Sequence, residues 1–155
     1  PLTLRHNIEY TASESLSDAE LGRILKIACL ESLVDSLPNG LDTDLGSDGG
    51  LLSTGQRQQV AIARMIAADP KIILLDEPTA SLDSKIEEQV LRNLLAWAKE
   101  KIVLIVSHQL DIAKSVKRIS VIDQGEIIAQ GDHRDLIESC ELYRVLCNGG
   151  VSNDE

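Results

Sequence analysis

The sequence predicts an α/β fold in which helices cover a mainly parallel β-sheet. Two short aliphatic segments, 72–75 and 102–106, flank a stretch of helical periodicity that contains Ile86, Val90 and Leu94. Strands that alternate with helices in this way are typical of parallel sheets in layered α/β domains. The composition agrees, because aromatic residues make up only 2% of the chain and its core must therefore be aliphatic, as buried parallel strands are.

The first third of the chain is polar and predicted to be helical. The sequence Ser17-Asp18-Ala19-Glu20 has the pattern of a capping box, and Pro38-Asn39-Gly40 breaks the chain. A helix is predicted over residues 54–68, with Ser53 or Thr54 as its N-cap. In chain order, the later predictions are a strand at 71–75, a helix at 85–99, a strand at 101–106, a short helix near 110–116, a hairpin of 118–123 and 126–129 around Gln124-Gly125, and a last helix near 132–147.

Composition excludes several classes of function. The net charge of −10 disfavours binding to nucleic acid, whose backbone is also negative. The three cysteines, Cys29, Cys140 and Cys147, are odd in number and not in a Cys-x-x-Cys spacing, which argues against disulfides and zinc. No apolar run approaches the roughly 18 residues of a membrane span. The chain begins without Met, and we expect it to be part of a longer polypeptide.

Two carboxylates follow the first aliphatic strand, at the end of the strand where ligands bind in parallel sheets. Asp76 and Glu77 are expected on an extended segment, where adjacent side chains point in different directions. One carboxylate can hold Mg²⁺, usually through water, and the other can orient or deprotonate an attacking water. The alternative is an acid-rich helix start with Pro78 in its first turn, but four preceding aliphatic residues favour a functional role.

Two further groups can contact phosphate. His108 follows the second strand and can donate a hydrogen bond to a terminal phosphate oxygen, although a solvent-facing loop histidine is a common alternative. Ser53, Thr54, Gly55 and Gln56 combine hydroxyls, a backbone without Cβ and the positive end of a helix dipole. These are the parts of an anion site, while in isolation an ordinary N-cap is the better interpretation.

In combination, these motifs resemble the exporter-type nucleotide-binding domain of ATP-binding cassette (ABC) proteins. Leu52–Gln56 is similar to the family's signature loop, 72–77 to its Walker B strand and the following glutamate, Ser81-Leu82-Asp83 to its D-loop, and His108 to its switch histidine. Thr54 stands where the family usually has Gly. The Walker A loop, which ends in Gly-Lys-Ser/Thr, and the Q-loop are absent, so the chain resembles the C-terminal two-thirds of such a domain.

The resemblance implies a truncated P-loop NTPase-like sheet with part of an α-helical subdomain. Residues 1–68 would form the helical subdomain with the signature helix, and residues 69–155 the Walker B, D-loop and H-loop part of the core with the C-terminal helix. Glu77 and His108 would be catalytic, and Asp76 would hold Mg²⁺, through water. The other implied site residues are Ser53, Thr54, Gly55 and Gln56, which contact a second subunit's nucleotide, and Ser81 and Asp83 of the D-loop; Asp83 can also cap the helix that begins near Ser84.

The function that the resemblance implies is ATP binding and hydrolysis coupled to transport by a membrane exporter. The domain would act at the cytoplasmic face of the membrane with Mg²⁺ and ATP. Its partners would be transmembrane domains and a second nucleotide-binding domain in a head-to-tail pair, without nucleic acid. Two alternatives remain: a soluble, non-transport ABC ATPase, or a non-catalytic cassette that supplies only its signature loop to a partner.

The missing strand has a structural consequence for the chain in isolation. In the family, the Walker A strand lies between the strands that correspond to 101–106 and 118–123. Its absence would leave unpaired backbone groups on both sides. We therefore expect the isolated chain to dimerise, swap a segment or shift its strands.

We predict that the 155-residue chain alone has negligible affinity for Mg-ATP and no ATPase activity, with neither ion nor nucleotide bound. The reason is that the Walker A lysine and amides, which hold the β- and γ-phosphates in the family, are absent. Calorimetric titration with Mg-ATP measures this directly, and micromolar affinity would contradict it.

Overall fold

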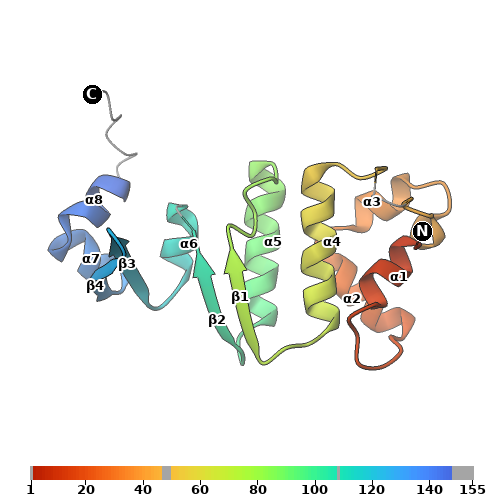
Figure 1. Ribbon diagram of the computed structural model, residues 1–155, viewed down its shortest axis with the longest axis horizontal. Coiled ribbons are helices and arrows are strands. Elements are labelled where there is room, and N and C mark those ends of the chain that lie inside the picture. The colour runs from red at the N-terminus through yellow and green to blue at the C-terminus, as the bar shows by residue number, and fades with distance from the viewer. Residues whose placement is uncertain (1, 47–49, 108, 148–155) are drawn as a thin grey trace. The chain divides into compact units, whose positions relative to one another are not determined.

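The computed structural model describes residues 2–46, 50–107 and 109–147. The chain forms two compact units, the first ending at Val106 and the second beginning at Ser107 (Figure 1). The functional division predicted between residues 68 and 69 falls inside the first unit and stays a prediction. No helix in the described ranges is long and apolar enough to span a membrane.

The first unit contains most of the helices and one pair of strands. Ser17 begins the second helix as predicted, because its Oγ accepts from the Glu20 amide at 3.3 Å while Glu20 accepts from the Ser17 amide at 2.9 Å. In chain order, the elements are α1 (Leu4–Glu9), α2 (Asp18–Ile27), α3 (Glu31–Ser36), a 3₁₀ turn (Gly40–Asp42), α4 (Thr54–Ala67), β1 (Ile72–Asp76), α5 (Ser84–Trp97) and β2 (Ile102–Val106).

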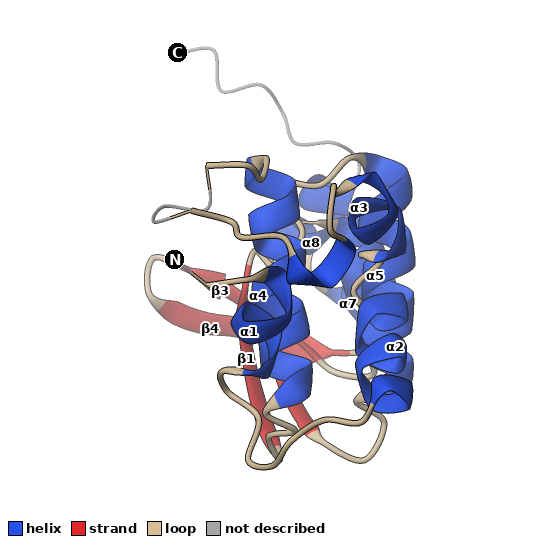
Figure 2. Ribbon diagram, turned by 90° about the vertical axis from the view of Figure 1, so that its right-hand side faces the viewer, coloured by secondary structure: helices blue, strands red, loops and turns tan. Residues whose placement is uncertain are grey.

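Helix α4 is at the centre of this unit's core. Its buried side chains, including Val60, Ala63 and Ile66, pack with those of α1, α2 and α5, and Figure 2 shows α1 beside α4. A polar contact fixes the two helices: Arg64 Nε donates to the Asn7 carbonyl at 2.8 Å, and its guanidinium also bonds the Asn7 side chain. Such hydrogen bonds from a charged group fix the C-terminal end of α4 against α1.

Strands β1 and β2 pair in parallel, from Ile72 opposite Ile102 to Asp76 opposite Val106. One face of this pair faces the helices, and Ile73 on it is only 2% exposed. The other face is aliphatic but uncovered. Its side chains are exposed to between 57% and 73%, namely Ile72, Leu74, Ile102, Leu104 and Val106.

The second unit contains α6 (Leu110–Ser115), β3 (Ile119–Asp123), β4 (Glu126–Gly131), α7 (His133–Ser139) and α8 (Glu141–Cys147). The predicted hairpin is confirmed: β3 and β4 are antiparallel, and Gln124 and Gly125 both have positive φ, as a tight two-residue turn requires. The single helix predicted near 132–147 is wrong, because Cys140 is extended and divides it in two. Burial of Cys140 together with Leu136 and Tyr143 explains the break.

The predicted α/β class is confirmed, but the described strands form two separate ladders rather than one sheet. The β1–β2 pair is parallel and the β3–β4 pair is antiparallel. Each strand pairs with its neighbour in the sequence, because the crossover helix α5 returns the chain beside β1 and the tight turn returns it beside β3.

Candidate functional site

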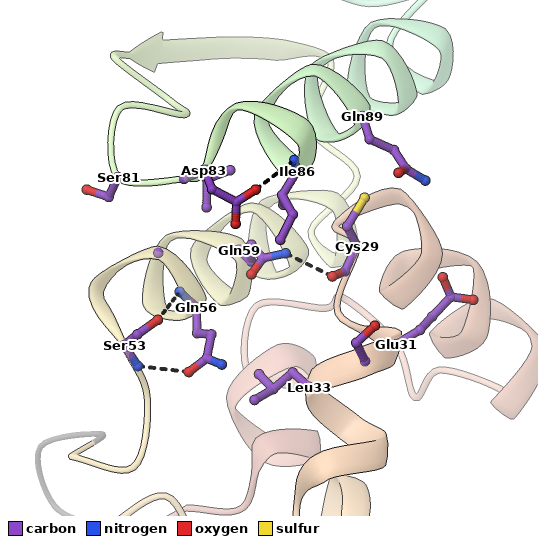
Figure 3. A pocket seen from close by; sticks show the side chains of 13 residues that line it. Cys29, Glu31, Leu33, Ser53, Gln56, Gln59, Ser81, Asp83, Ile86 and Gln89 are labelled. Carbon is purple, nitrogen blue, oxygen red and sulfur yellow. Dashed lines mark hydrogen bonds between the residues drawn. The ribbon is translucent and has the colours of Figure 1, made fainter.

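The turn that begins α4 is built as a reciprocal cap. Ser53 Oγ accepts from the Gln56 amide at 3.2 Å, and Gln56 Oε1 accepts from the Ser53 amide at 2.8 Å (Figure 3). From the sequence, either Ser53 or Thr54 was expected to be the N-cap of this helix, and the structure shows that it is Ser53. The Thr54 and Gly55 amides in the first turn have no partner within the helix, and the anion site expected at this turn stays a prediction.

Thr54 and Gly55 have different local roles. The Thr54 hydroxyl accepts from Arg57 Nη2 at 3.2 Å, while Arg57 Nη1 donates to the Leu52 carbonyl at 3.0 Å, so Arg57 ties the turn together. Gly55 lies against the chain near residue 81: a Cβ at Gly55 would be 2.7 Å from the Ser81 carbonyl oxygen. Glycine is required here by the close approach of another backbone segment.

Asp76 is the last residue of β1, and its side chain is exposed. Glu77 is partly buried and has φ +44°, in the left-handed region. The prediction of an extended segment is therefore wrong at Glu77. The reason is that its amide donates to the Val106 carbonyl at 3.0 Å while its own carbonyl accepts from the Ala80 amide at 3.3 Å, which turns the chain sharply after the strand.

The turn after Glu77 continues to the start of α5, and we call residues 77–83 the post-strand segment. Asp83 caps α5 as predicted, because its carboxylate accepts from the Ile86 amide at 3.3 Å. The buried Thr79 hydroxyl donates to Glu87 at 2.8 Å, which anchors the middle of the segment on the same helix. His108, the remaining predicted catalytic residue, lies outside the described residues.

A cavity of about 360 Å³ brings several of the predicted residues together (Figure 3). It lies between the start of α4, the post-strand segment, α5 and the junction of α2 and α3. Asp76, Glu77 and Thr54 do not line it, so the two predicted clusters do not share one cavity. The predicted site residues in its wall are Ser53, Gly55, Gln56, Ser81 and Asp83.

Two glutamines of this region make contacts that sequence reasoning missed. Gln58 bonds the post-strand segment, and the buried Gln59 donates to the carbonyls of Ala28 and Cys29 at 3.0 and 2.8 Å. Burial raises the pKa of the Cys29 thiol. The only signal in the sequence is that two glutamines follow one another inside an amphipathic helix, and nothing local identifies their distant partners.

The exposed Asp76 carboxylate fits a magnesium ion that is bound together with a nucleotide. In the described part of the chain, no three His, Cys, Asp or Glu side chains gather into a metal-binding group. Such a group is not needed, because Mg²⁺ that accompanies a nucleotide usually takes one or two carboxylates and completes its shell with phosphate oxygens and water. Asp76 would hold it, and when bound it would neutralise charge on the phosphates.

The family model for ABC transporters matches residues 3–80, which include the α4 turn and the Asp76–Glu77 pair. The chain belongs to the ABC transporter family. A solved bacterial Atm1-family ABC exporter with ATP bound is similar, with a TM-score of 0.86 and 34% identity over 94% of this chain and 26% of that one. The fold and the family predicted from the motifs are thereby confirmed.

Curated relatives in the ABC family point to exporters. An ATP-dependent lipid A-core flippase of Alcanivorax borkumensis is 40% identical over 98% of this chain and 26% of its own. A multidrug resistance ABC transporter ATP-binding and permease protein of Lactococcus lactis is 38% identical over 91% of this chain and 24% of its own. The chain thus spans about a quarter of the length of these relatives.

Replacement of Gly55 by Ala is predicted to destabilise the chain by about 1–3 kcal/mol, because the new methyl group would overlap the Ser81 carbonyl. Gly22→Ala in α2 is the matched control, since nothing lies within 4 Å of the position that a Cβ would take there. That change should stabilise by about 0.5–1 kcal/mol through helix propensity. Urea unfolding at fixed protein concentration measures both, and a Gly55→Ala protein as stable as Gly22→Ala would disprove the contact.

Proposed function

We propose that this chain is part of the ATP-binding and ATP-hydrolysing domain of an ABC membrane exporter, in which ATP binding and hydrolysis drive transport. The observation that supports this most directly is the placement of Asp76 and Glu77 at the carboxyl end of β1, followed by a tight turn that rests on α4. Carboxylates at that end of a strand are where α/β domains bind ligands. The exporter names of the relatives support the transport assignment.

In this proposal each residue has a defined task. Asp76 holds Mg²⁺ through water, and Glu77 orients and polarises the attacking water. His108 bonds the terminal phosphate. The α4 turn, Ser53 to Gln56, contacts the nucleotide bound by a second domain in a head-to-tail pair, with Ser81 and Asp83 of the D-loop nearby. Transmembrane domains would be the other partners, and the chain would work at the cytoplasmic face of the membrane.

The alternatives are less well supported. A soluble ABC ATPase that acts on nucleic acid fits poorly with the net charge of −10 and with relatives named as a flippase and a multidrug transporter. A non-catalytic cassette that only lends its signature loop to a partner would have no use for Glu77. The strained, multiply hydrogen-bonded backbone of Glu77 therefore favours a catalytic role.

The substitution Glu77→Gln in the full-length exporter that contains this chain is predicted to lower ATP turnover by about 10²- to 10⁴-fold, since the amide cannot act as a base. Binding of Mg-ATP should persist, because the amide is nearly the same size. Phosphate release and nucleotide binding measure the two effects. Glu88→Gln is the control, on an exposed α5 carboxylate that pairs with Arg92 at 3.0 Å, and it should turn over ATP normally. Unchanged turnover in Glu77→Gln would remove Glu77 from the role.

We also propose that the isolated chain self-associates through the uncovered aliphatic face of β1 and β2. The pair Leu74→Thr and Leu104→Thr should shift the chain towards monomer in sedimentation velocity, because it removes apolar surface that is 73% and 60% exposed. Ile127→Thr on β4 is the control, since Ile127 is also 60% exposed but lies on the other ladder. An equal loss of association in the control would refute the assignment to this face.

A further inference from the structure

Gln58 is hydrogen-bonded at both ends of its side-chain amide to the post-strand segment. Its Nε2 donates to the Glu77 carbonyl at 3.0 Å, and its Oε1 accepts from the Ser81 amide at 3.1 Å. The side chain is partly buried, and its bond to the Glu77 carbonyl is partly shielded from water, while the bond from the Ser81 amide is exposed. One residue of α4 therefore brackets the turn that follows the candidate catalytic glutamate.

The backbone of Glu77 needs such a support. A non-glycine residue at φ +44° is strained, and strained residues persist where surrounding contacts over-determine them. The Val106 carbonyl holds the Glu77 amide from the strand side, and Gln58 and the Ala80 amide both bond its carbonyl. Val106 belongs to β2 and Ala80 to the turn itself. Gln58 belongs to α4, which contacts the turn from the side opposite the strands.

The same face of α4 carries Gly55, one turn before Gln58. The backbone of Ser81 lies so close to Gly55 that a Cβ would be 2.7 Å from its carbonyl oxygen. Gly55 and Gln58 are three residues apart and thus neighbours on the helix surface. Because this interface contains a backbone contact and two hydrogen bonds and has no room for a methyl group, a shift of the start of α4 must move the post-strand segment with it.

We propose that Gln58 is a positioning residue that couples two groups of this chain that face nucleotides, the α4 turn (Ser53 to Gln56) and Glu77. This rests on the proposed function, in which the α4 turn contacts the nucleotide of the opposite domain while Glu77 acts on the chain's own nucleotide. Gln58 connects these two sites through one side chain. Occupancy of the opposite site, sensed by Ser53 to Gln56, thereby sets the position of the Glu77 carboxylate, and hydrolysis at one site becomes dependent on the other.

A purely structural role makes a different prediction. If Gln58 only stabilised α4, its loss would disturb the α4 turn and the Glu77 site alike. If Gln58 positions Glu77, its loss lowers turnover only at the site whose Glu77 lies in the same copy as the altered Gln58. Mixed dimers of the full-length exporter distinguish the two, because each composite site takes Glu77 from one copy and the α4 turn from the other.

The experiment uses mixed dimers purified through two different affinity tags, in which one copy carries Glu77→Gln and only one site can turn over. Gln58→Leu, which keeps the side-chain size but removes both bonds, is placed either in the same copy as Glu77→Gln or in the other copy. We expect turnover to fall about ten- to a hundredfold only when Gln58→Leu shares a copy with the intact Glu77. The KM for ATP should stay within about twofold, as positioning acts on the chemical step.

Two further variants sharpen the test. Gln58→Glu retains an acceptor for the Ser81 amide but has no donor for the Glu77 carbonyl, and it should behave like Gln58→Leu. Gln130→Leu makes the same substitution on β4, where the exposed Gln130 side chain donates to the Ser120 hydroxyl at 2.7 Å, and it should leave turnover unchanged. Amide hydrogen exchange at Ser81 should accelerate in Gln58→Leu, which reports the bond itself without any catalytic readout.

Equal losses of turnover in both arrangements of the mixed dimer, or none, would overturn the coupling, as would unchanged exchange at Ser81. A proportional rise in KM would also overturn it, because the effect would then lie in binding. Failure of the proposed function has a separate signature. In that case, dimers with Glu77→Gln in both copies would still hydrolyse ATP at the normal rate.

Discussion

The contact between α4 and the post-strand segment is the constraint on which the rest of the site depends. Gly55 allows the Ser81 backbone to reach the helix, and Gln58 then bonds the turn on both sides of Thr79. Because Asp83 ends the same segment and caps α5, the segment is fixed at both ends. The candidate phosphate-facing turn and the candidate catalytic carboxylate are thereby parts of one packed assembly instead of two independent loops.

The strained backbone of Glu77 is stabilised by hydrogen bonds from the elements around it. Glu77 leaves the strand in a left-handed conformation that few side chains adopt, and hydrogen bonds from β2, from the following turn and from α4 stabilise it. The α4 helix is in turn fixed at its far end by the bonds of Arg64 to α1. Preorganisation of this kind is what a catalytic carboxylate requires, since a misplacement of about 1 Å can cost a large part of the rate.

The first unit covers only one face of its strands. The inner face of β1 packs towards helices, while five aliphatic side chains of β1 and β2 remain exposed on the other. A patch of this kind is unusual on a soluble monomer and is typical of a surface where apolar groups associate. The proposed self-association of the isolated chain uses this face.

The sequence by itself determined the features that depend on neighbouring residues. The caps at Ser17 and Asp83 and the turn at Gln124-Gly125 follow from short-range hydrogen bonds and backbone preferences, and motif order was sufficient to identify the family. The tertiary structure decided the rest. The bonds of Gln58 span 19 and 23 residues, the left-handed Glu77 is held by β2 and α4, and the helix break at Cys140 follows from burial. None of these has a local signature, because each is stabilised by groups that meet only when the chain has folded.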